Sequence, residues 1–219
     1  HSNWSDGAPT MEEMAEYAIK KGYRYLVVSD HSQSLHVAHG LKNEELLEQI
    51  DEIDRLNDKY KGFTILKASE VDIKTDGSLD FPDKLLEKLD VVIAAIHSGF
   101  KQEREKITER MIAAIQNPYV NVIAHPTGRL ISRREGYEVD LDKVMDACAA
   151  TGTALEINCF YDRLDLDDVN CRKAKERGVK IAISTDAHHL DQMWMIELGV
   201  GIARRGWLEA KDVINTFHL

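Results

Sequence analysis

Eight side chains of this sequence are candidate ligands of divalent metal ions. They are His1, Asp6, His31, Glu70, His97, His125, Asp186 and His188. Imidazole and carboxylate ligands without thiolate suit Zn²⁺, Mn²⁺ or Fe²⁺ better than Ca²⁺, or Mg²⁺ alone. Eight ligands are too many for one tetrahedral ion, so the set predicts two or three divalent ions. Paired ions activate a hydroxide and hold the oxygens of an in-line phosphoryl displacement, which indicates hydrolysis of phosphoesters.

The positions of these residues favour one shared site. Short β-branched runs predict strands at residues 25–28, 64–66, 91–96, 120–124, 154–157 and 180–183. Most of the eight residues lie at or just beyond the ends of these runs, and the carboxyl ends of parallel strands gather at one face. A single histidine there is more often a hydrogen-bonded or surface residue. Several polar groups buried together are costly unless cations pair with them, so the joint pattern favours metal binding.

Helical patterns alternate with the predicted strands. Thr10 and Glu13 predict a capping box at the start of a first helix, which Gly22 ends. Asn43 is expected to cap a second helix. Further helices are expected at residues 107–115, 141–150 and 167–177, and two helical stretches follow the last strand. Repeated β-α units predict one α/β domain over residues 1–219, a parallel barrel rather than a doubly wound sheet, because no Gly-rich phosphate fingerprint is present.

Composition and charge narrow the class of protein. The formal net charge of −10 argues against a protein that binds nucleic acid over its whole surface, although it does not exclude binding at a local site. Cys148, Cys159 and Cys171 have no CxxC spacing, so neither a disulfide framework nor a thiolate zinc site is expected. The sequence has no apolar run long enough to span a membrane and no signal peptide pattern, so we expect a cytoplasmic protein without membrane partners.

The residues around the predicted ligands resemble the successive motifs of the PHP (polymerase and histidinol phosphatase) superfamily. The matching segments are residues 1–7, Ser29-Asp30-His31-Ser32, Glu70, Ile96-His97-Ser98, Ala124-His125-Pro126 and Ser184-Thr185-Asp186-Ala187-His188. Four further segments resemble the C-terminal PHP domain of bacterial family X DNA polymerases. They are Trp4-Ser5-Asp6-Gly7, Ala38-His39-Gly40-Leu41, His125-Pro126-Thr127-Gly128-Arg129 and Arg163-Leu164-Asp165-Leu166.

The resemblance implies a distorted (β/α)7 TIM-like barrel with a trinuclear metal site. By this resemblance Glu70 bridges two ions, one also held by His1 and Asp186 and the other by His97 and His125. The third ion is assigned to Asp6, His31 and His188, and Glu70, Asp186, His97 and His125 are the implied catalytic residues. In the family this site performs Mn²⁺-dependent 3′-5′ exonuclease and 3′-end phosphoesterase chemistry on DNA. The implied partners are DNA 3′ ends, reached through an attached polymerase domain.

The chain departs from the family pattern at its start. The superfamily opens with a strand that ends in His-x-His, and His1 matches only the second histidine. We therefore expect a fragment of a longer polymerase that lacks the first strand of the barrel. The ion assigned to His1 and Asp186 is expected to be held less well than the other two.

Three more residues are expected to bind substrate, and two other functions stay open. Arg129 and Arg163 match phosphate geometry, and Asn158 at a strand end either lines the site or orients a ligand. The first alternative function is a stand-alone PHP phosphatase on a small phosphomonoester such as histidinol phosphate. The second is a non-catalytic module, stabilised by metals, that serves as a scaffold for a polymerase.

Overall fold

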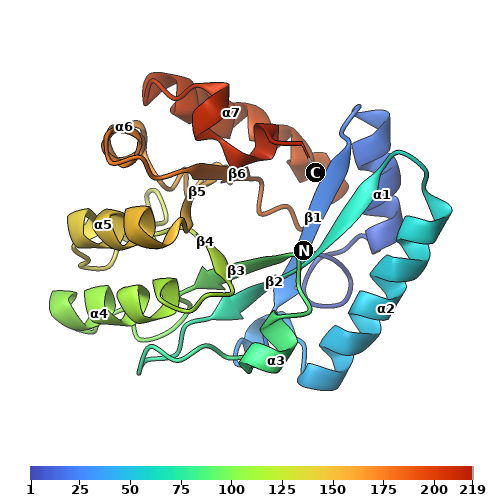
Figure 1. Cartoon of the computed structure of the whole chain (residues 1–219), viewed down its shortest axis with the longest axis horizontal. Coiled ribbons are helices and arrows are strands. Elements are labelled where there is room, and N and C mark those ends of the chain that lie inside the picture. The colour runs from blue at the N-terminus through green and yellow to red at the C-terminus, as the bar shows by residue number, and fades with distance from the viewer. Residues whose placement is uncertain (219) are drawn as a thin grey trace.

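A single sheet of parallel strands forms the centre of the computed structural model, which describes residues 1–218. The strands are Tyr25–His31 (β1), Thr64–Asp72 (β2), Val91–Ala95 (β3), Val120–Ile123 (β4), Ala154–Asn158 (β5) and Ile181–Ser184 (β6). They pair in sequence order, and every neighbouring pair is parallel. Figure 1 shows the sheet curling around a centre with the helices outside it. The six strands confirm the predicted α/β TIM-like fold, one strand short of the seven that the family resemblance implies.

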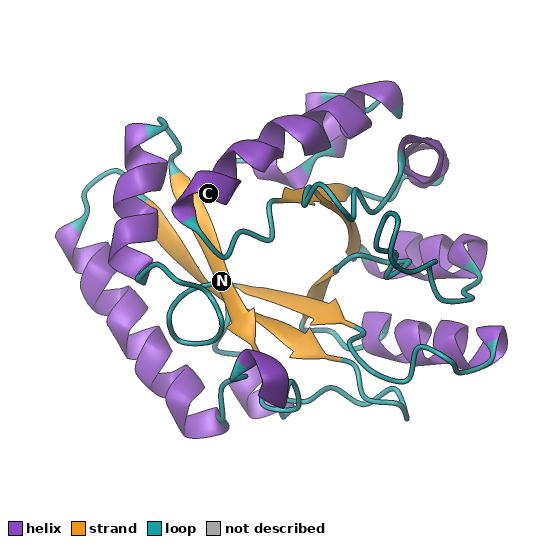
Figure 2. Cartoon of the chain, turned by 180° about the vertical axis from the view of Figure 1, so that it is seen from behind, coloured by secondary structure: helices purple, strands orange, loops and turns teal. Residues whose placement is uncertain are grey.

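Helices cover the outer face of this curled sheet (Figure 2). The α-helices are Met11–Lys20 (α1), Asn43–Lys59 (α2), Asp83–Leu86 (α3), Arg104–Ile115 (α4), Leu141–Thr151 (α5), Asp168–Glu176 (α6) and Ile196–Arg205 (α7). Short 3₁₀ turns are His36–Ala38 (η1), Leu190–Met195 (η2), Ala210–Asp212 (η3) and Ile214–Thr216 (η4). None of the described helices combines the length and the apolar character that crossing a bilayer requires.

The predicted start of the first helix is confirmed, and that of the second is wrong by one residue. The main-chain N–H of Glu13 donates to Thr10 Oγ1 at 3.2 Å, and that of Thr10 donates to Glu13 Oε2 at 2.8 Å. In α2, Lys42 is the N-cap and Asn43 is already helical. The N–H of Lys42 donates to Glu45 Oε2 at 2.7 Å, so this glutamate satisfies the helix end without the side chain of Asn43.

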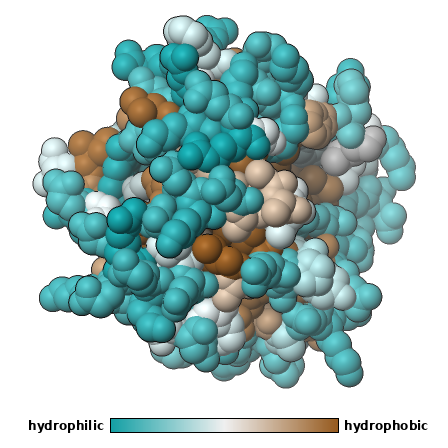
Figure 3. Space-filling view, turned by 60° about the vertical axis from the view of Figure 1, so that its left-hand side comes forward, coloured by the Kyte–Doolittle hydropathy of each residue, from teal (hydrophilic) through white to brown (hydrophobic). Residues whose placement is uncertain are grey.

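Side chains alternate between two cores along β3. Val92 and Ala94 pack in the main core, whereas Ile93 and Ala95 belong to a smaller core inside the curl. The inner core consists largely of alanines, which allow the strands to curve around a narrow interior. The face of the molecule seen in Figure 3 is mostly hydrophilic, with a few apolar patches.

Candidate metal centre

All eight predicted ligands come together at the carboxyl ends of the strands. His31 is the last residue of β1 and pairs in register with Glu70 on β2. His97, His125 and Asp186 each follow two residues after the end of β3, β4 and β6. A cavity of about 190 Å³ at this face is lined by seven of the eight, namely Asp6, His31, Glu70, His97, His125, Asp186 and His188. His1 is buried behind them and contacts Glu70 and Asp186.

Glu70 lies at the centre of the first group. Its Oε1 is 3.0 Å from His125 Nε2 and 3.1 Å from His97 Nε2. Its Oε2 is 3.3 Å from His1 Nε2, which is also 2.9 Å from Asp186 Oδ1. Both carboxylate oxygens therefore face different sets of nitrogens, which is the arrangement that a ligand shared by two ions requires.

Asp6 connects the second group. Its Oδ1 is 3.3 Å from His188 Nε2 and 3.8 Å from His31 Nε2. The ring of His1 stacks between the two histidines, with centroid separations of 4.2 Å to His31 and 4.4 Å to His188. The group therefore adjoins the Glu70 group through His1 rather than standing apart from it.

The donor set fits divalent cations. Ligands about 2.0–2.2 Å from a shared ion lie roughly 3–3.5 Å from one another, and most of the nitrogen–oxygen separations in both groups have this size. Three sets of ligand atoms each fall within 4.8 Å: His1-Asp6-His31-His188, His31-Glu70-His97 and His1-Glu70-Asp186. Among the described residues, the buried Nδ1 atoms of His1, His31 and His125 have no hydrogen-bond partner. Such a cluster of imidazoles and carboxylates is what the sequence predicts for two or three ions, and it fits them chemically.

Two hydrogen bonds fix which ring nitrogen faces the cavity. His97 Nδ1 donates to Asp72 Oδ1 at 2.5 Å, and His188 Nδ1 donates to the main-chain oxygen of Asp186 at 2.9 Å. With a proton on Nδ1, the Nε2 of each ring is the nitrogen that faces the carboxylates, and it would bind a cation in place of a proton. Asp72 was not predicted from the sequence, although a carboxylate at the end of an apolar strand could have indicated a residue of the site.

Two more buried carboxylates hold the main chain beside the ligands. Asp30, which is 1% exposed, accepts from the Ser2 N–H at 2.7 Å and from Gln49 Nε2 at 2.6 Å, next to His1. Glu156 accepts from the N–H of His125 at 2.6 Å. His125 itself has a φ of 28°, and Asp186 one of 52°, a left-handed conformation that is costly for such residues and recurs at functional sites. The role of Glu156 was not predicted from the sequence, because this residue lies within a strand instead of at its end.

The pKa values of several side chains in and beside the site are strongly shifted. Burial opposes the ionised form of Glu70, but the charge of His31 and hydrogen bonds from three histidines hold the pKa of this carboxyl well below its usual range. Burial also lowers the pKa of His97, yet hydrogen bonds to Asp72 and Glu70 raise it to about 9. Burial and the nearby charges of Glu70 and Asp186 raise the pKa of Glu156 to about 8. In the absence of cations, side chains at and beside the metal centre therefore keep protons at neutral pH.

The three predicted substrate residues have different surroundings. Arg163 lines the cavity, with its Nε 3.5 Å from Asp186 Oδ2. Asn158 is buried and donates from Nδ2 to the same oxygen at 3.0 Å, which suits orientation of a ligand. Arg129 donates to the main-chain oxygens of Arg163 and Leu164, so its guanidinium holds this loop. For Arg129 the structure favours a structural role over the predicted contact with substrate.

The chain is similar to several known proteins. The family model described as PHP domain matches residues 1–159. The chain is 50% identical over its full length to DNA polymerase/3′-5′ exonuclease PolX of Bacillus subtilis (strain 168), of which it spans 38%. It is 34% identical, over 94% of the chain and 84% of the relative, to a protein of Thermoanaerobacter sp. (strain X514) named "Probable phosphatase".

A solved structure shares the fold. The histidinol phosphate phosphatase of Lactococcus lactis, crystallised with zinc, L-histidinol and phosphate, superposes with a TM-score of 0.68 at 17% identity. The superposition covers 95% of this chain and 92% of that one. At this level of identity the likeness concerns the fold alone.

Proposed function

Because the chain belongs to the PHP-domain family, we propose that it is a metal-dependent phosphoesterase that trims DNA 3′ ends with 3′-5′ polarity. The expectation of a metal-dependent phosphoester hydrolase is confirmed at the level of the family. The narrower DNA activity is the proposal. It is supported by the likeness of the whole chain to the polymerase and exonuclease relative, although the chain spans 38% of that protein.

The contacts of Glu70 are the observation that carries the hydrolytic site. We assign Glu70, His1 and Asp186 to one cation, Glu70, His97 and His125 to a second, and the Asp6 group to a third. Divalent cations held by these residues would lower the pKa of water and neutralise charge on phosphate oxygens, so the chain would need no nucleophile of its own. We place Mn²⁺, Zn²⁺ and Fe²⁺ among the fitting ions on ligand type.

In this proposal, three residues of the chain position the substrate or the metal ligands. Arg163, at the cavity wall, binds a phosphate oxygen of the substrate, since guanidinium groups match phosphate geometry. Asn158 holds the direction of Asp186 by donating to its Oδ2. Asp72 keeps the proton of His97 on Nδ1, so that Nε2 stays available to a cation.

A second function is favoured by one specific observation. The chain spans most of the Thermoanaerobacter relative named as a phosphatase, and a phosphatase structure shares its fold. A small phosphomonoester such as histidinol phosphate is therefore the alternative substrate class.

The two substrate classes are separated by direct assay. With Mn²⁺ added, we expect the 219-residue chain to shorten a 5′-labelled single-stranded oligonucleotide one nucleotide at a time, with slower hydrolysis of histidinol phosphate. Hydrolysis of the phosphomonoester without any shortening of the oligonucleotide would overturn the exonuclease proposal and leave the phosphatase.

The scaffold alternative is tested by Glu70→Gln. This change keeps the size of the side chain but removes the charge that two cations share, so we expect at least about a hundredfold loss of kcat/KM and a lower bound metal content. Metal content is measured by mass spectrometry and folding by circular dichroism. The matched control is Glu176→Gln on the exposed surface of α6, where the activity is expected to stay at the wild-type level. Absence of any metal-dependent hydrolysis by the folded, metal-loaded wild type would favour a scaffold, whereas full activity of Glu70→Gln would show that hydrolysis does not depend on this site.

A further inference from the structure

A second, larger cavity adjoins the metal centre. Its volume is about 500 Å³, and it is lined by Gly99, Phe100, Lys101, Arg134, Glu135, Gly136 and Tyr137. These residues belong to the two loops that follow β3 and β4, the strands before His97 and His125. We call it the base cavity.

The walls of the base cavity are tied to the predicted metal ligands. Gly99 is two residues from His97 in the chain. The Tyr137 hydroxyl donates to the main-chain oxygen of His125 at 3.5 Å. Arg134 donates from Nη2 and Nε to the oxygen of Gly128 at 2.7 and 3.2 Å, three residues after His125. The walls of the base cavity therefore belong to the same two loops as His97 and His125.

The chemistry of the wall suits an aromatic, anionic ligand. The Arg134 guanidinium lies 4.3 Å from the centroid of the Phe100 ring, which stacks at 6.1 Å and 8° on Tyr137. Bases stack on aromatic rings and on guanidinium planes. Among the described residues, Arg134 forms no ion pair, so its charge is available to a phosphate. Lys101 adds a second cation, and the exposed Glu135 carries the negative charge of this wall.

One arginine lines each of the two cavities. Arg163 lines the smaller cavity at the predicted ligands, which we call the metal pocket, and Arg134 lines the base cavity. Burial lowers the pKa of Arg134, and the charge of Arg163 lowers it further. In a chain with a net charge of −10, Arg134 and Lys101 are cations that a phosphate can contact at the base cavity.

Size distinguishes the two cavities. The metal pocket, at about 190 Å³, is small for a whole nucleotide, whereas about 500 Å³ lies in the range of pockets for drug-sized ligands. We propose that the base cavity binds the nucleoside next to the cleaved phosphodiester of single-stranded DNA, with its base against the wall formed by the Arg134 guanidinium on Phe100 and its phosphate at the edge of that guanidinium. This inference rests on the proposed function and names the group that separates DNA from a small phosphomonoester.

Direct binding tests the proposal independently of hydrolysis. The probe is a fluorescent oligothymidylate with hydrolysis-resistant phosphorothioate linkages, and its affinity is measured by fluorescence anisotropy. We expect Phe100→Ala and Arg134→Gln each to weaken binding about tenfold, the size of one lost stacking contact. Arg134→Gln should also reduce the slope of log affinity against log salt by about 0.7, as one lost phosphate contact does for single strands. Phe100→Leu keeps the bulk of the side chain and is expected to lose affinity as well.

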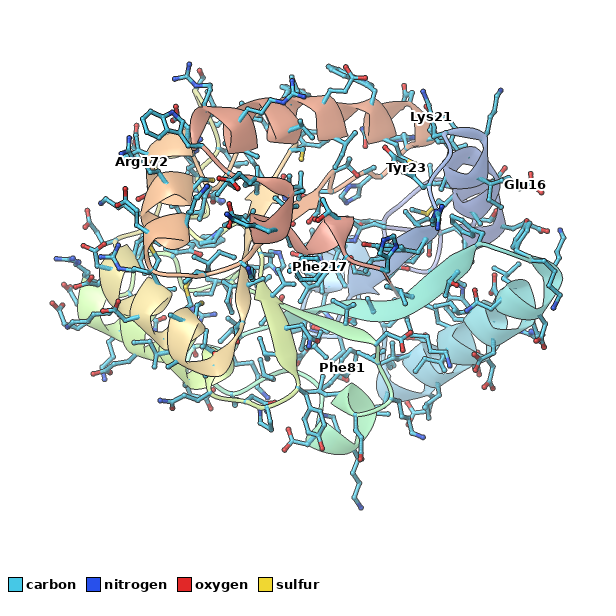
Figure 4. All side chains as sticks on the ribbon, turned by 45° about the horizontal axis from the view of Figure 1, so that its top comes forward. Glu16, Lys21, Tyr23, Phe81, Arg172 and Phe217 are labelled. Atoms are coloured by element: carbon cyan, nitrogen blue, oxygen red, sulfur yellow. The ribbon has the colours of Figure 1, made fainter. Side chains whose placement is uncertain are left out.

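Matched controls lie away from the cavity. Phe217→Ala removes an exposed phenyl ring of the C-terminal segment, labelled in Figure 4, which lines neither cavity. Arg205→Gln removes an exposed cation of α7 that contacts Asp168. Both controls are expected to bind the oligonucleotide like the wild type.

Hydrolysis of p-nitrophenyl phosphate, which needs only the metal pocket, is the second measurement. We expect it to stay within twofold of the wild type in the two Phe100 variants, because the phenyl ring makes no hydrogen bond to the loop that carries His125. Unchanged oligonucleotide binding in these variants, or a parallel loss of p-nitrophenyl phosphate hydrolysis, overturns the base cavity. Wild-type binding without cleavage of an unmodified oligonucleotide contradicts the proposed function instead, and the binding of the variants still decides the cavity.

Discussion

At the scale of single residues, the site depends on polar groups that hold the predicted ligands in place. Asp72 fixes His97, Glu156 holds the main chain of His125, and Asn158 contacts Asp186. Such partners set the tautomer and the direction of a ligand, and their loss is felt in metal affinity. The four residues Asp30, Asp72, Glu156 and Asn158 are all at least nine-tenths buried, so each is held by its surroundings.

Asp72→Asn tests this arrangement. The amide no longer provides the charge that supports His97, so we expect Mn²⁺ affinity and kcat/KM to fall by about 10–100-fold. Metal titration by calorimetry and steady-state kinetics measure the two effects, and excess Mn²⁺ should restore part of the activity. The control Asp76→Asn lies in an exposed turn, where its carboxylate accepts from Ser78. If both variants behave alike, Asp72 has no role in positioning His97.

At the scale of elements, the loops after the strands decide where the ligands lie. The loop after β4 turns sharply, with φ of 63° at Gly128, and it packs against Tyr137. An added Cβ at Gly128 would lie 2.3 Å from Tyr137 Cε1, so the tyrosine ring requires a glycine here. The same loop carries His125, which links the packing of Tyr137 to the metal centre.

Gly128→Ala is therefore expected to cost more stability than an ordinary glycine replacement. The control Gly22→Ala has a similar left-handed φ of 82° but open space around the new methyl group. Both variants bear the left-handed conformation, and overpacking should add about 1–3 kcal/mol for Gly128→Ala alone. Urea denaturation measures the free energy of unfolding, and kcat/KM is expected to drop only for Gly128→Ala. Equal losses in the two variants would show that Tyr137 moves aside freely.

Most of the strands and helices were predictable from the sequence, and the exceptions have physical reasons. The strands and longer helices agree with the apolar periodicity within a few residues, because that pattern is local. The four-residue helix α3 was missed, since one turn has no periodicity to detect. Asn43 was misplaced because Glu45 satisfies the end of α2 instead.

At the scale of the whole molecule, the metal centre concentrates negative charge in a chain that is already acidic. Glu70 is buried and Asp186 is half-buried near Glu156, and protons on the histidines balance these charges when no cation is bound. Metal ions and protons therefore compete for the same groups, so stability depends on both.

Metal removal should make the protein sensitive to rising pH. The folded-state pKa of His97 is raised to about 9, so its contribution is complete below pH 6.5 and is lost as the pH approaches 9. Glu156, with a pKa raised to about 8, is neutral in the folded protein where the unfolded chain is ionised, so stability falls in the same direction. Each group adds a slope of about 1.4 kcal/mol per pH unit within its range.

Thermal unfolding at pH 6 and at pH 9, with EDTA or with Mn²⁺, measures this effect. We expect the melting temperature of the EDTA-treated protein to fall over this interval and that of the Mn²⁺-loaded protein to change much less. A metal-free protein whose melting temperature rises toward pH 9 would contradict the proton balance assigned to the site.

The sequence by itself determined the order of the elements, the parallel direction of the strands and the eight side chains that meet at their carboxyl ends. These follow from local patterns, since an apolar run sets a strand and the residue at its end is placed by the shared direction of the sheet. Only the tertiary structure decided which atoms face one another. Contacts such as His1 with Asp186, Asp72 with His97, and Arg129 with the loop at Arg163 join residues far apart in the chain. Their geometry depends on the curl of the sheet and on side-chain rotamers, which no local pattern specifies.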